Sequence, residues 1–125
     1  MNHFISLALA EQMTAQYRSS YESILKPEFQ QSGILPLCES FDRAPFDVLL
    51  AKNGCTGLRI YYGMDEELKI HAIIVGTNEA GEDMLTISPA SSLAAGSMTT
   101  ETEDEIIERG NRCPDICPPE SPLNP

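Results

Sequence analysis

Apolar residues recur at intervals of three and four positions near the start of the chain, which is the spacing of one face of a helix. These residues are Ala10, Met13, Tyr17, Tyr21 and Ile24. Ser6 can cap such a helix, because its hydroxyl accepts a hydrogen bond from an amide that lacks a partner in the first turn. Pro27 ends it, since proline disfavours helical geometry at the residue before it. The pattern predicts an amphipathic helix over about residues 6–25.

A second, shorter helix is predicted from about Asp42. Phe46 and Leu49 follow helical spacing, and Gly54 supplies a left-handed stop after them. The short apolar stretch before this helix contains Pro36, which has no amide hydrogen to donate to a neighbouring strand. We therefore expect that stretch to be an edge strand or an extended connection.

Two later segments, 58–62 and 68–75, are rich in β-branched and aromatic residues and are separated by an acidic turn, which predicts a hairpin. One register, in which the numbers of facing residues sum to 132, gives the hairpin a wholly apolar face, whereas a slip of one residue mixes the two faces. The facing pairs in this register are Leu58–Ile74, Ile60–Ala72 and Tyr62–Ile70. Arg59, Tyr61 and His71 then lie on the opposite face. We expect the apolar face to pack against the helices.

The segments that follow the hairpin have weaker patterns. Residues 84–87 predict a third strand, and the small and polar residues at 88–99 predict a loop. Thr100 and Glu103 have the spacing of a capping box, which predicts a short helix near 101–109.

Proline dominates the end of the chain: five of the nine prolines lie between Pro114 and Pro125. This tail is expected to be irregular, either extended or draped over the domain. Together the elements predict an α+β fold, in which an N-terminal amphipathic helix and a second short helix pack on a small antiparallel sheet and a Pro/Cys-rich tail follows. We expect a single domain over 1–110 and the tail over 111–125, because a chain of 125 residues supports one ordinary core.

The chain is acidic, with 19 Asp and Glu against 8 Lys and Arg and a net charge of −11. Such a surface repels nucleic-acid phosphate and anionic membranes, so neither is an expected partner. A protein with a basic surface, or a second copy of this chain, is expected instead. No segment has the ~18 apolar residues of a membrane span. Because the first residues also lack the basic start of a secretory signal, we expect a cytoplasmic protein.

Cys113 and Cys117 flank the sequence Pro-Asp-Ile, and a turn at Pro-Asp would bring their sulfurs together. Three interpretations stay open. The two residues pin the tail to the domain by packing or by a disulfide, they form a redox pair, or they supply half of a zinc site. A complete zinc site needs four nitrogen or sulfur ligands. The further ligands would come from Cys38, Cys55, His3 or His71.

The hairpin face that bears Arg59, Tyr61 and His71 is a second candidate site. A guanidinium, a phenol and an imidazole together can bind a carboxylate or a phosphate, and His71 could titrate near neutral pH. Ile73 and Val75 share this face, which favours the alternative that another element or a partner covers it and that the cluster is ordinary cross-strand packing.

Several stretches of the chain resemble one group of proteins. They are Ile34–Leu37, Phe41–Arg43, Gly57–Asp65, Lys69–Gly76 and Arg112–Pro119. In them the chain is similar to a family of small uncharacterised bacterial proteins, mostly from Bacteroidota. The resemblance covers most of the chain except 88–99. It implies a bacterial, single-domain protein, and it implies no activity, cofactor or catalytic residue.

The function that these observations favour is a non-catalytic interaction or binding protein. The sequence contains no phosphate-binding, zinc-protease, hydrolase-elbow or EF-hand motif, and its two histidines have no identifiable nucleophile and orienting carboxylate beside them. The alternative is a thiol- or metal-dependent protein that uses Cys113 and Cys117, with zinc as the metal.

Overall fold

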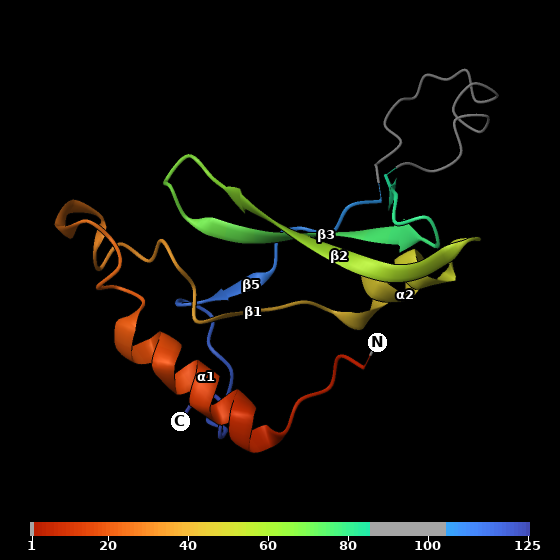
Figure 1. Cartoon of the computed structure of the whole chain (residues 1–125). Coiled ribbons are helices and arrows are strands. Elements are labelled where there is room, and N and C mark those ends of the chain that lie inside the picture. The colour runs from red at the N-terminus through yellow and green to blue at the C-terminus, as the bar shows by residue number, and fades with distance from the viewer. Residues whose placement is uncertain (1, 86–104) are drawn as a thin grey trace. The chain divides into compact units, whose positions relative to one another are not determined.

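The computed structural model describes residues 2–85 and 105–125. Within these ranges the chain forms two α-helices, a short 3-10 helix and two small antiparallel sheets, which confirms the predicted α+β class (Figure 1). No helix in the described ranges is both long and apolar enough to cross a lipid bilayer.

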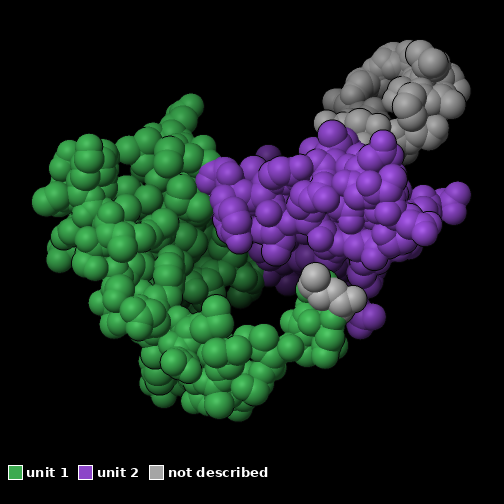
Figure 2. Space-filling model, in the orientation of Figure 1, with its two compact units in different colours: residues 1–40, 64–70, 111–125 green, residues 41–63, 71–110 purple. Residues whose placement is uncertain are grey.

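The chain divides into two compact units, each assembled from segments that are distant in sequence (Figure 2). Unit 1 comprises Met1–Ser40, Met64–Ile70 and Asn111–Pro125, and unit 2 comprises Phe41–Gly63 and His71–Gly110. Unit 1 therefore combines the N-terminal helix, the tip of the hairpin and the C-terminal segment. Unit 2 contains the second helix and most of the hairpin.

Unit 1 begins with helix α1, Leu7–Ser20. Its N-terminus is the predicted one, because the Ser6 hydroxyl accepts a hydrogen bond of 3.0 Å from the Leu9 amide. The helix ends at Ser20, earlier than the end near residue 25 that was predicted from Pro27. A turn then precedes the 3-10 helix η1, Pro27–Phe29. The predicted apolar face is only partly covered, since Met13 is 58% exposed and Ile24 is 74% exposed.

The small sheet of unit 1 joins two segments that are distant in the sequence. Strand β1, Cys38–Ser40, pairs antiparallel with strand β5, Asn111–Cys113, so that Cys38 faces Cys113. The first residues of the tail are thus regular, where the pattern had predicted none. The reason is that the prolines begin only at Pro114, which leaves the amides of β5 free to donate.

Unit 2 contains helix α2, Arg43–Ala51, and the strands β2, Cys55–Met64, β3, Ile70–Asn78, and β4, Asp83–Met84, although the tip residues Met64 and Ile70 belong to unit 1. The strand order is β2-β3-β4. Gly54, with φ of +91°, makes the predicted left-handed turn between α2 and β2. The predicted second helix and hairpin are therefore confirmed, while the register between β2 and β3 stays a prediction.

The core of unit 2 is small. Leu49 on α2 packs with Ile74 on β3 and with Ile107, and Phe41 and Phe46 lie against this cluster. Ile107 is held in place by two backbone hydrogen bonds of 2.8 Å to Ile74. This core confirms that the helix packs on the sheet at Ile74.

The predicted burial of the apolar face is wrong for strand β2. Leu58 is 39% exposed, Ile60 is 52% exposed and Tyr62 is 77% exposed. Helix α2 has nine residues, about 13 Å of helix, whereas β2 has ten residues, about 33 Å of strand. Because α2 is the only helix in the described part of unit 2, it cannot cover the length of the strand.

The predictions for the helix at 101–109 and for the third strand differ from the structure in part. The described end of the predicted helix at 101–109 is not helical, since Ile107 is in an extended bridge and Arg109 has a φ of +68°. The third strand is present as β4, one residue earlier than predicted at its start. Residues 86–104, which include the predicted loop at 88–99, lie outside the described residues.

Candidate functional site

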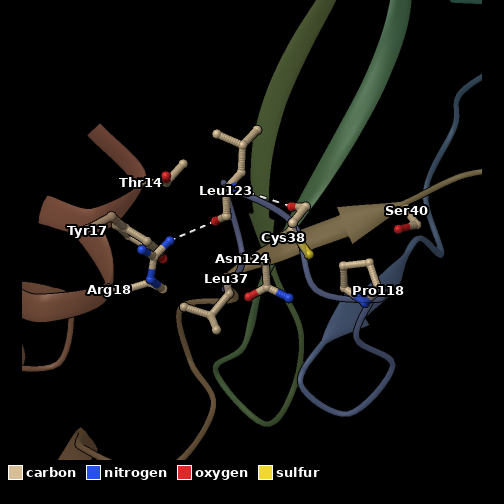
Figure 3. A pocket seen from close by; sticks show the side chains of 10 residues that line it. Thr14, Tyr17, Arg18, Leu37, Cys38, Ser40, Pro118, Leu123 and Asn124 are labelled. Carbon is tan, nitrogen blue, oxygen red and sulfur yellow. Dashed lines mark hydrogen bonds between the residues drawn. The ribbon is translucent and has the colours of Figure 1, made fainter. Parts of the chain in front are cut away.

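A cavity of about 330 Å³ lies in unit 1, between α1, β1 and the C-terminal segment (Figure 3). The residues that line it are Thr14, Tyr17, Arg18, Leu37, Cys38, Ser40, Pro118, Ser121, Leu123 and Asn124. Cys38 is a free cysteine, so the lining includes a thiol. The cavity therefore brings a thiol together with polar and apolar side chains from three separate segments.

Side chains of α1 fix two walls of this cavity. The Arg18 guanidinium donates a 2.7 Å hydrogen bond to the Leu123 carbonyl, which ties the C-terminal segment to the helix. The Tyr17 hydroxyl donates a 2.7 Å hydrogen bond to the Pro36 carbonyl just before β1. Burial raises the pKa of Tyr17, since it disfavours the phenolate form. Both contacts orient the chain around Cys38.

Cys113 and Cys117 form a disulfide with a Cα–Cα distance of 4.5 Å. A disulfide fits two of the three interpretations of this pair, a bond that pins the tail and a redox pair, and both sulfurs are unavailable as zinc thiolates in this state. Among residues 2–85 and 105–125, no group of three or more His, Cys, Asp or Glu side chains is arranged to hold a metal ion. Cys113 is 1% exposed, whereas Cys117 is exposed.

Arg112, next to the disulfide, donates hydrogen bonds to three backbone carbonyls, and the sequence pattern did not single it out. Its Nε donates to the Ile70 carbonyl at 3.0 Å, and its Nη2 donates to the carbonyls of Gly33 and Ile34 at 2.9 and 3.1 Å. One guanidinium thus joins β5, the hairpin tip and the segment before β1, and all of these contacts are within unit 1. The planar fork of donors suits arginine and not lysine.

In unit 2, the predicted anion site at Arg59, Tyr61 and His71 already holds an anion from the chain itself. Arg59 and Tyr61 both donate to the carboxylate of Asp83 on β4. His71 lies instead beside Glu108, with 3.4 Å between its Nδ1 and the Glu108 Oε1. The structure therefore brings Arg59 and Tyr61 together at Asp83 and places His71 beside a different carboxylate, that of Glu108.

The contacts of Asp83 lower the pKa of its carboxyl group. The hydroxyl of Tyr61, and then the guanidinium of Arg59, hold the pKa of the Asp83 carboxyl below its ordinary value, because both donate to the charged form. The same contacts raise the pKa of Arg59. A depressed carboxyl pKa stabilises the fold above the pKa of the unfolded chain, and this contribution is lost as the pH falls through the lower folded pKa.

We expect Tyr61→Phe to raise the pKa of Asp83 toward its ordinary value, because the substitution removes the donor with the largest effect. A carbon-13 NMR titration of the Asp83 carboxyl measures the shift. The matched control is Tyr62→Phe, a neighbouring tyrosine that is 77% exposed and should leave the Asp83 pKa unchanged. Equal pKa values in the two variants would contradict the assignment.

The residues that the sequence left out share one property: their partners are distant along the chain. Cys38 was considered only as a zinc ligand, Asp83 was not singled out, and Arg112 bonds to residues 42, 78 and 79 positions away. The sequence patterns act over a few residues, so they could not find these contacts.

No protein-family model matches this chain, and no curated protein and no solved structure matches it either. The resemblance to an uncharacterised bacterial family therefore stays a prediction.

Proposed function

We propose that this chain is a non-catalytic interaction protein that self-associates through strand β2. The observation that carries the proposal is the row of apolar side chains on this strand. Leu58, Ile60 and Tyr62 alternate along β2 and are 39%, 52% and 77% exposed. Exposed apolar side chains at alternate positions of a strand favour a protein partner, because contact with one removes them from water.

The position of β2 in its sheet supports the same conclusion. It is the first strand in the order β2-β3-β4, so in the part of the chain that the structure describes it has a neighbour on one side only. A ten-residue edge offers backbone donors and acceptors to an added strand. Backbone pairing would supply affinity, and the apolar side chains would supply specificity.

A second copy suits this edge better than a basic protein does. The segment from Cys55 to Met64 contains no acidic residue and one basic residue, Arg59, which is already paired with Asp83. A basic partner would find no charge complementarity along this strand, whereas two copies would bring no acidic side chains together despite the net charge of −11.

The order of residues in β2 also allows a two-fold arrangement. If two antiparallel copies are centred on Ile60, then Leu58 of one copy faces Tyr62 of the other, and Ile60 faces itself. Arg59 then faces Tyr61 rather than a second arginine. The apolar rows of the two copies become continuous, and no like charges are opposed.

Sedimentation velocity of the purified chain and of Ile60→Lys tests the proposal. We expect the unmodified chain to dimerise and the variant to have a dissociation constant raised by at least about tenfold, because two lysines would be opposed at the axis. The matched control is Ile24→Lys, at an isoleucine of unit 1 that is 74% exposed, and it should still dimerise.

Two results would contradict the proposal: a monomeric unmodified chain at concentrations of about 0.1 mM, or equal dimerisation of both lysine variants. The dependence of binding on salt distinguishes self-association from binding of a basic protein. Binding of a basic protein would weaken as ionic strength rises, whereas pairing of apolar strands would persist. The basic partner and the cytoplasmic location, which the net charge and the N-terminal sequence favour, stay predictions.

A further inference from the structure

We propose that the three cysteines of unit 1 form an internal thiol–disulfide exchange site, in which the free thiol of Cys38 attacks the Cys113–Cys117 disulfide. This inference goes beyond the interaction proposed for β2 and does not depend on it, since β2 contributes nothing to the three sulfurs. It rests on the pairing of β1 with β5, on the burial of each cysteine and on the cavity beside Cys38.

The strand register places the nucleophile beside its target. Cys38 and Cys113 are direct partners in the antiparallel pair, so their side chains leave the same face of the sheet. Directly opposite residues have Cβ atoms about 4.5–5.5 Å apart, and a disulfide joins Cβ atoms about 3.5–4.5 Å apart. A movement of about 1 Å is therefore enough to bond Cys38 to Cys113.

The burial of the three residues determines which sulfur is attacked and which sulfur leaves. Cys113 is 1% exposed, so its sulfur is shielded from thiols in solution, while Cys38 is its direct partner on the adjoining strand. Cys117 is exposed, so the charge of the leaving sulfur is hydrated as it develops. Cys38 also lines the cavity of about 330 Å³, so there is open space beside this residue (Figure 3).

The step balances without an external oxidant. Cys38 loses its proton to water, and its thiolate attacks the Sγ of Cys113. The Cys38–Cys113 bond forms, the Cys113–Cys117 bond breaks, and the electron pair of the broken bond goes to the Sγ of Cys117, which takes up a proton. The number of disulfides is unchanged. The product holds its disulfide across the β1–β5 pair and presents Cys117 as an outward thiol.

An outward thiol defines the class of substrate. The Cys117 thiolate can attack the disulfide of another molecule, forming a mixed disulfide and releasing that molecule's second sulfur as a thiolate. The site would therefore act on disulfides of small thiols or of proteins. Attack on either class depends on the internal exchange step, which alkylation of the exposed thiol can test.

Limiting N-ethylmaleimide, added to the purified full chain with no thiol or oxidant, traps the exchanged state. We expect label on Cys117 together with a disulfide that links the peptide containing Cys38 to the peptide containing Cys113, detected by mass spectrometry without reduction. In Cys38→Ser the link should be absent, and the label on Cys117 should fall at least about tenfold, because the adjacent nucleophile is gone.

Cys55→Ser is the matched control, since Cys55 is the other free cysteine and belongs to unit 2. It should leave both the link and the label unchanged. Cys38→Ala repeats the test with a second side chain, and circular dichroism checks that each variant is folded. The proposal is overturned if the unmodified chain gives no link between residues 38 and 113, or if Cys117 is labelled equally with and without Cys38.

Discussion

Replacing Leu49 by alanine is expected to lower the free energy of unfolding by about 3 kcal/mol. Leu49 is 2% exposed and is the residue through which α2 packs on Ile74 and Ile107. Truncating a buried leucine removes its transfer free energy and leaves a cavity that the surroundings fill only in part. In the described part of the chain the cluster has three buried members, so the neighbours can do little to compensate for the loss.

Urea unfolding followed by circular dichroism measures this change. Leu50→Ala is the matched control, because Leu50 is the next residue in the same helix and is 50% exposed, and it should cost less than about 1 kcal/mol. Hydrogen exchange adds a local readout at the Ile74 amide, which donates to Ile107 and should lose protection in Leu49→Ala. Equal costs for the two leucines would show that the core of unit 2 lies elsewhere.

The second large effect is expected at Arg112. Replacing it by alanine should cost about 2–3 kcal/mol, because three backbone carbonyls lose charged donors at once. This loss is smaller than the sum for three such hydrogen bonds, because the Arg112 side chain is only partly buried. Arg112→Lys should recover less than half of the loss, since an ammonium cannot reach carbonyls on both sides of the fork.

Urea unfolding again provides the measurement, with Arg43→Ala as control. The Arg43 side chain is 89% exposed and pairs with Asp47 four residues along the same helix, so its loss should cost less than about 0.5 kcal/mol. The Ile70 amide, which donates to Ile34 in the segment held by Arg112, should lose protection in Arg112→Ala. Full recovery by lysine would contradict the role of the guanidinium fork.

These two substitutions act in different units, and so do the two proposals. Leu49 and Ile60 belong to unit 2, whereas Arg112 and the three exchanging cysteines belong to unit 1. Ile60→Lys should therefore leave the maleimide trapping at Cys117 unchanged, and Cys38→Ser should leave dimerisation unchanged. Each proposal can fail without affecting the other.

The sequence by itself determined the elements whose signals are local. Ser6 caps α1 and Gly54 turns the chain after α2, and both act on amides and dihedral angles within a few residues. The high content of β-branched and aromatic residues likewise identified the strands of the hairpin. These features could be predicted because the chain between the interacting groups is too short to adopt many alternatives.

Only the tertiary structure decided what faces what over long separations. It paired Cys38 with Cys113, joined Arg112 to carbonyls as far as 79 positions away, and placed Asp83 against Arg59 and Tyr61. It also left the apolar side of β2 exposed, because the covering helix is shorter than the strand. Periodicity indicates which side of a strand is apolar, but the side that is buried depends on which distant segments close against it, and that choice is made by the packing of the whole chain.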